Sequence, residues 1–141
     1  MLAQTMLDSG QFDEALALIK KGYRLDPKLY PVFLGILCKS YIYLGRYEEA
    51  LEVISQMEEH AQRGAFIPKF MPPLSYSFVY QELGREEEAH AYMTEALKMN
   101  PDLSLDSIRR ISRFINPDHL QRELAAYRQA GMPEKAAGAV Q

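Results

Sequence analysis

A short motif occurs three times along this sequence, with the same order of residue types except at one position of the third copy. The copies begin at Gly10, Gly45 and Gly84 and read Gly-x-(aromatic)-x-Glu-Ala, except that Glu86 replaces the aromatic residue in the third. The lengths of chain between successive motif glycines are nearly equal. A unit that recurs in this way is typical of a stacked array, in which each unit buries its apolar face against its neighbours. We therefore expect a repeat protein.

The parts of the motif suit a pair of antiparallel α-helices. Glycine adopts the positive φ that ends one helix, and alanine lets two helix backbones approach closely. Pro27 and Pro101 follow the first and third motif glycines at the same distance and can end the second helix. Apolar residues at helical spacing, as in Leu51, Ile54 and Met57, supply an inward face. The pattern predicts helical hairpins without β-sheet, with turns near Ser9-Gly10, Leu44-Gly45 and Leu83-Gly84.

This pattern resembles the tetratricopeptide repeat (TPR), a helical hairpin with a period of about 34 residues. The resemblance covers residues 1–103 and implies an all-α fold, an α-α superhelix of about three TPR hairpins. It places Ala50 and Ala89 at close contacts between helices. The first repeat lacks the front half of its first helix. Because the end of a solenoid is normally capped, we expect this chain to be a piece of a longer protein.

The second and third repeats are joined by a longer segment than the period requires. Residues 60–73 contain Gly64, Pro68, Pro72 and Pro73, which predict an extended connection rather than helix. The second helix of repeat two is expected to run a turn longer than usual.

The repeat pattern stops after Pro101, but signals for helices continue over residues 104–133. Ser104 can cap one helix, and Pro117 suits the first position of another, which Gly131 would end. Two short helices there would close the array. Residues 134–141 are expected to form a flexible tail.

The same region resembles the ends of TPR regions in bacterial signalling proteins. In that family the repeats follow an N-terminal effector, commonly a class III adenylate or guanylate cyclase domain. The resemblance implies a regulatory or assembly region, but the metal-binding aspartates of a cyclase have no counterpart here, so the activity is not carried over. The residues that carry it lie at 101–106 (PDLSLD), 116–120 (NPDHL) and 127–134 (YRQAGMPE).

Charge and composition exclude several classes of function. Sixteen Lys and Arg against nineteen Asp and Glu give a net charge of -3, which provides no general attraction to nucleic acid or anionic membranes. No apolar run approaches the roughly 18 residues of a membrane-spanning helix, and residues 1–10 lack the pattern expected of a signal peptide. The single cysteine, Cys38, cannot form an internal disulfide. We expect a cytoplasmic protein that neither binds nucleic acid nor inserts into membranes.

The sequence offers no candidate catalytic, metal or cofactor site. His60, His90 and His119 lie on separate expected elements, without the ligand spacing of a zinc site. Cys38 falls where the TPR family packs a small residue between helices, so we expect a buried, unreactive thiol. Four arginines of the tail are interleaved with acidic residues, which favours a solvated face over a nucleic-acid surface. These are Arg109, Arg110, Arg113 and Arg122.

The resemblance also implies a binding surface, because the first helix of each TPR lines a concave groove. This groove is apolar at its middle and has one basic residue, Lys39, so a clamp for a terminal carboxylate is not expected. An apolar helix or extended segment that desolvates Tyr43 and Phe78 fits better. Equally, these residues could pack on neighbouring helices. Carried over by position, the groove residues are Gln4, Asp8, Val32, Gly35, Lys39, Ile42, Tyr43, Leu74, Phe78, Gln81 and Glu82.

The sequence therefore favours a non-catalytic module for protein–protein interaction or self-association, within a larger bacterial signalling protein. Its partner would be a protein, a peptide or a second copy of the chain. The main alternative is a freestanding adaptor or chaperone that binds an amphipathic segment of a client. A weaker alternative is a helical repeat that binds nucleic acid.

Overall fold

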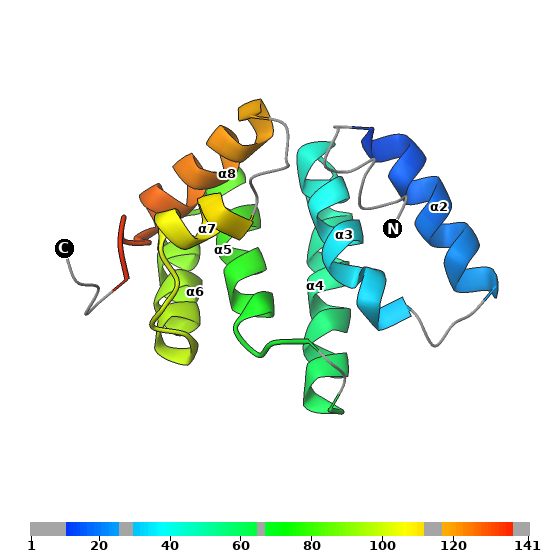
Figure 1. The fold of residues 1–141 in the computed structure, drawn as a ribbon, viewed down its shortest axis with the longest axis horizontal. Helices are drawn as coiled ribbons and strands as arrows, with labels where there is room; N and C mark the ends of the chain where they lie inside the picture. Colours follow the sequence, from blue (N-terminus) through cyan, green and yellow to red (C-terminus); the bar gives the residue numbers. More distant parts are fainter. Residues whose placement is uncertain (1–10, 26–29, 65–66, 112–116, 137–141) are drawn as a thin grey trace. The chain divides into compact units, whose positions relative to one another are not determined.

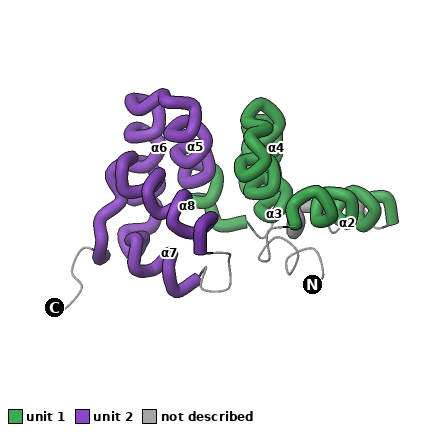
Figure 2. Tube along the Cα trace, turned by 90° about the horizontal axis from the view of Figure 1, so that it is seen from above, with its two compact units in different colours: residues 1–72 green, residues 73–141 purple. Residues whose placement is uncertain are grey.

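The computed structural model describes residues 11–25, 30–64, 67–111 and 117–136, and within these ranges the chain forms seven α-helices and no strand (Figure 1). This confirms the prediction of an all-α helical repeat fold. The chain divides into two compact units, residues 1–72 and residues 73–141 (Figure 2).

Unit 1 contains α2 (Phe12–Leu25), α3 (Tyr30–Tyr43) and α4 (Tyr47–Gln62), and α3 packs against both of the others. The sequence of α3 is apolar on all sides, which suits a helix with neighbours on more than one face. By contrast, α4 is amphipathic, and one face carries its buried residues. With 16 residues, α4 is longer than the 14-residue α2 and α6, by about half of the full turn that the sequence predicted.

Unit 2 contains α5 (Met71–Glu82), whose first turn crosses the unit boundary, α6 (Glu86–Met99), α7 (Leu105–Ile111) and α8 (Pro117–Ala130). Tyr92 of α6 packs its ring 4.7 Å from that of Tyr76 and 5.6 Å from that of Tyr80, so α5 and α6 form a hairpin. Helix α8 packs against both α6 and α7. The two helices predicted after the repeats are therefore present.

The helical hairpins turn at the glycines that the motif predicted. Gly45 and Gly84 both have φ of 76°. The N–H of Arg46 donates to the carbonyl of Tyr41 at 2.8 Å, and the N–H of Gly45 donates to the carbonyl of Ile42 at 3.0 Å. The turn at Gly84 repeats both bonds, which together form a Schellman motif and satisfy carbonyls that the helix end leaves free. The turn predicted at Ser9-Gly10 lies outside the described residues.

An arginine follows each of these glycines, and its side chain contacts one residue before the turn and one after it. Arg46 lies 4.9 Å from the centre of the Tyr41 ring and pairs with Glu49. The turn at Gly84 has the same arrangement, in which Arg85 lies 5.1 Å from the Tyr80 ring and pairs with Glu88. The repeat therefore includes a side-chain contact that the glycine and alanine pattern did not reveal.

The motif alanines lie in the helical core. Ala15, Ala50 and Ala89 are fully buried, with 0% of their surface exposed. A larger side chain at these positions would meet the neighbouring helix.

The connection between the repeats is shorter than predicted. Helix α4 continues to Gln62 and α5 begins at Met71, so the prediction of an extended segment over residues 60–73 is wrong at both ends. Pro72 and Pro73 lie in the first turn of α5, where the N–H groups have no acceptor within the helix. Proline is tolerated there because it removes no helical hydrogen bond.

Candidate partner-binding site

The predicted groove residues fall on two helices of different units. Gln4 and Asp8 lie outside the described residues, and Val32 lies in α3 with its side chain outside the described part. Of the remaining residues, α3 carries Gly35, Lys39, Ile42 and Tyr43, and α5 carries Leu74, Phe78, Gln81 and Glu82. Each of these α3 residues has a counterpart on α5. The two are as far apart in sequence as the motif glycines Gly45 and Gly84.

On α3, the two C-terminal groove residues belong to the core of unit 1. Ile42 is 1% exposed and Tyr43 is 8% exposed. The Tyr43 ring stacks on Phe12 of α2, with the ring centres 5.0 Å apart. Gly35 and Lys39 are half-buried, so they are the more accessible members of this set.

On α5, three of the four groove residues contact α8. Phe78, which is 1% exposed, meets the ring of Tyr127 edge-on, with the ring centres 5.5 Å apart. Nε2 of Gln81 donates to Oε1 of Gln129 at 2.9 Å. Helix α8 therefore covers the groove face of α5.

The third of these contacts is an ion pair. Nε of Arg122 donates to Oε1 of Glu82 at 2.7 Å, and the two side chains are 32% and 19% exposed. The pair is a charge-assisted hydrogen bond, and an exposed pair of this kind usually contributes about 0.2–1 kcal/mol. Helix α8 thus contributes one aromatic, one amide and one charged contact to the C-terminal part of α5.

One polar atom at this contact is left without a partner. Oε1 of Gln81 is buried and accepts no hydrogen bond, although Nε2 of the same side chain is bonded. A buried acceptor without a donor costs about 1–3 kcal/mol. Gln81 is therefore not fully satisfied by α8.

A second line of contacts joins α8 to α6. Nδ1 of His90 lies 3.0 Å from the carbonyl oxygen of Ala130, and this bond requires a proton on Nδ1. Gly131 has φ of 114°, and a Cβ at that position would lie 3.2 Å from the same imidazole nitrogen. Glycine suits the end of α8 for two reasons. It tolerates the positive φ, and it has no side chain that would crowd the His90 ring.

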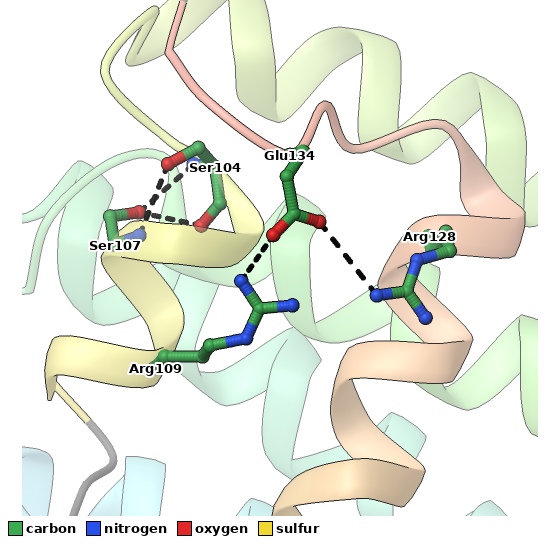
Figure 3. A network of polar contacts seen from close by, with 5 residues as sticks. All are labelled: Ser104, Ser107, Arg109, Arg128 and Glu134. Carbon is green, nitrogen blue, oxygen red and sulfur yellow. Dashed lines mark hydrogen bonds and ion pairs between the residues drawn. The ribbon is translucent and has the colours of Figure 1, made fainter.

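The chain after α8 returns to the start of α7 (Figure 3). Ser104 and Ser107 exchange hydrogen bonds between side-chain oxygens and backbone N–H groups, in a variant of the capping box. The N–H groups of Leu105 and Asp106, which lie between them, donate to the carbonyls of Pro133 and Glu134. The N–H groups of the first turn of α7 are therefore all bonded.

The side chain of Glu134 also contacts α7 and α8. Its carboxylate pairs with Arg109 of α7 and lies 3.8 Å from Arg128 of α8 (Figure 3). The hydrogen bond from Arg109 holds the pKa of the Glu134 carboxyl below its usual value, and the same bond raises the pKa of Arg109. Glu134, the first residue of the segment expected to be flexible, is thus bonded to two helices.

Sequence reasoning did not identify Arg122, Tyr127 and Gln129 as contacts of the groove. Nothing in the sequence around Tyr127 indicates which helix its ring meets. Of the four tail arginines, Arg109 and Arg122 are in ion pairs within unit 2, and Arg113 lies outside the described residues.

The described part of the chain also bears on metal binding and membrane insertion. No three His, Cys, Asp or Glu side chains come close enough there to hold a metal ion. None of the described helices combines the length and the hydrophobicity needed to cross a membrane. Cys38 is buried, as predicted.

Comparison with known proteins agrees with the geometry of the hairpins. Residues 6–65 match one family described as "Tetratricopeptide repeat", and residues 74–103 match a second family with the same description. No curated protein matches the chain. The two matches leave out only the N-terminal residues, a short connection and the region that contains α7 and α8. Together they cover well over half of the sequence, and the chain belongs to the tetratricopeptide-repeat family.

Proposed function

We propose that this chain is a non-catalytic module that binds a protein or peptide, or a second copy of itself, through the first helices of its repeats. One observation carries the proposal. The groove face of α5 holds another helix, α8, through Phe78, Gln81 and Glu82. A surface that binds one helix by side-chain contacts has the chemistry to bind another.

On α3 the corresponding face offers Gly35 and Lys39. A Cβ placed on Gly35 would meet no atom within 4 Å, and the residue has no positive φ. Neither packing nor backbone conformation within unit 1 therefore requires glycine, which costs about 0.5–1 kcal/mol in the middle of a helix relative to alanine. The close approach of a partner to the α3 backbone would account for it.

We further propose that the parent protein is a bacterial signalling protein in which these repeats follow an effector such as a nucleotide cyclase domain. The tail motif at residues 127–134 supports this assignment. It contains Gly131 at the end of α8 as well as Pro133 and Glu134, which close unit 2. A reading frame that encodes an effector domain before the repeats would agree with the proposal. A frame limited to the repeats would favour the freestanding adaptor or chaperone.

The binding face on α3 can be tested by filling the open space beside Gly35. We expect Gly35→Gln to leave the helical content unchanged and to weaken association at least about tenfold, because the new side chain occupies the place of the partner. Sedimentation velocity measures self-association. Affinity capture from lysate, followed by titration of the captured protein, measures binding to another partner.

The matched control places the same side chain on the exposed face of α4. Ser55→Gln should leave both kinds of association as they are in the parent chain. Equal association of the parent and both variants would show that the α3 face is not the binding surface.

A further inference from the structure

We propose that α8 is an intramolecular ligand of the α5 face, so that an amphipathic partner helix binds the third repeat only by competing with α8. This inference rests on the proposed function, because it assigns the occupant of one of the two groove faces. It differs from a purely structural role of α8, in which the helix would only cover apolar surface.

The contacts between α8 and α5 are of a kind that can distinguish one helical ligand from another. Arg122 and Gln129 are separated by two helical turns, and so lie on one face of α8. They meet Glu82 and Gln81, which are adjacent residues of α5. Each contact pairs a specific donor with a specific acceptor, and Tyr127 adds an aromatic contact on Phe78. Such pairing specifies a partner in a way that apolar cover alone does not.

The buried acceptor of Gln81 indicates which ligand would fit better than α8. Its Oε1 receives no hydrogen bond from α8 or from any other described residue. A competing helix would carry a basic residue for Glu82, an aromatic residue for Phe78, and an additional N–H or O–H donor for Gln81. The matching partner is therefore an amphipathic helix that resembles α8 and adds one donor.

Competition from α8 lowers the apparent affinity of such a partner, because the partner binds only those molecules in which the α5 face is open. The smaller this open fraction is, the weaker the apparent affinity becomes. A substitution on α8 raises that fraction and leaves the α5 face intact. A substitution on α5 raises the same fraction but also removes a contact to the incoming helix. Substitution of Arg122 and substitution of Glu82 should therefore affect partner binding differently, although each removes the same intramolecular ion pair.

The probe is a fluorescein-labelled peptide with the sequence of residues 117–133, titrated with the full chain and followed by fluorescence anisotropy. We expect Arg122→Ala to bind this peptide about three- to tenfold more tightly than the parent chain, because α8 competes less well. Glu82→Gln should bind it about as weakly as the parent chain, because its more open face has lost the carboxylate that would pair with the arginine of the peptide. Thermal melting should show a similar loss of stability in both variants.

A second peptide, in which alanine replaces the arginine corresponding to Arg122, supplies the reciprocal control. It should bind the Arg122→Ala chain about three- to tenfold more weakly than the first peptide does. The inference is overturned if Arg122→Ala binds the first peptide no better than the parent chain. It is also overturned if Arg122→Ala and Glu82→Gln gain equally, since the peptide would then bind elsewhere. In either case, loss of partner binding in Gly35→Gln would leave the proposed function standing.

Discussion

Glu134 ties the end of α8 to the start of α7 through its backbone and its side chain. The carbonyl accepts from the N–H of Asp106, and the carboxylate pairs with Arg109. Only the second of these contacts depends on charge. The two contributions can therefore be separated by a substitution that keeps the shape of the side chain.

The charged contribution should depend on pH. The pKa of Glu134 is lowered in the folded state by the hydrogen bond from Arg109. A lowered pKa means that the stabilisation is complete above the ordinary pKa of glutamate and is lost as the pH falls through the lowered value. We expect Glu134→Gln to reduce the melting temperature slightly at pH 7 and to match the parent chain at about pH 2–3. Both side chains are well exposed, so the effect at pH 7 should be small.

Glu95→Gln is the control for this comparison, because Glu95 is an exposed residue within α6. It should not reproduce the difference at pH 7. A pH-independent effect of Glu134→Gln would indicate that the charge of Glu134 does not stabilise unit 2.

At the scale of the helix, the hairpin turns were predictable from sequence because their causes are local. Gly84 supplies the positive φ, and the bonds it completes join residues that are close neighbours along the chain. Ser104 and Pro117 mark helix starts for equally local reasons. The prolines at 72 and 73 misled the prediction, because proline ends a helix or begins one according to its position.

One substitution made at two glycines tests this account of the helices. Gly84→Ala should lower the free energy of unfolding by about 1–2 kcal/mol, because alanine is strained at a φ of 76°. Gly35→Ala should raise it by up to about 1 kcal/mol, because Gly35 lies within a helix and has open space beside it. Urea unfolding of the two variants measures both changes. The same sign for both would contradict the assigned roles.

The motif alanines offer a test of helix packing. Ala89 has no exposed surface, so Ala89→Leu should force the neighbouring side chains apart and cost about 1–3 kcal/mol. The corresponding change at an exposed position of the same helix, Ala91→Leu, should change the melting temperature little. A midpoint for Ala89→Leu equal to that of the parent chain would mean that α6 does not pack closely there.

At the scale of the whole chain, the sequence predicted the helical hairpins but not which of their surfaces remain open. The groove positions on α3 and α5 follow from the repeat, since they are as far apart as the motif glycines Gly45 and Gly84. Whether they meet solvent depends on residues far along the chain. Tyr127 reaches Phe78, and Phe12 reaches Tyr43. No local pattern encodes such contacts, because they arise only when segments distant in sequence pack together.

Burial of these rings changes what their substitution can show. Phe78→Ala would open a cavity in unit 2 and should cost about 3–5 kcal/mol, so it cannot separate binding from folding. Since each unit has its own core, we expect this variant to lose amide hydrogen-exchange protection in α5–α8 and to retain it in α2–α4. Equal loss in both sets of helices would mean that the units unfold together.

The return of the chain onto α7 has a consequence for biosynthesis. The N–H groups of Leu105 and Asp106 find their acceptors only beyond the end of α8, at Pro133 and Glu134. During translation these two N–H groups therefore lack their acceptors until Pro133 and Glu134 have left the ribosome. Contacts within unit 1 involve only earlier residues and can form while that synthesis continues. We expect nascent chains arrested before Pro133 to be cleaved by protease within α7 and those arrested well beyond Glu134 to resist cleavage there.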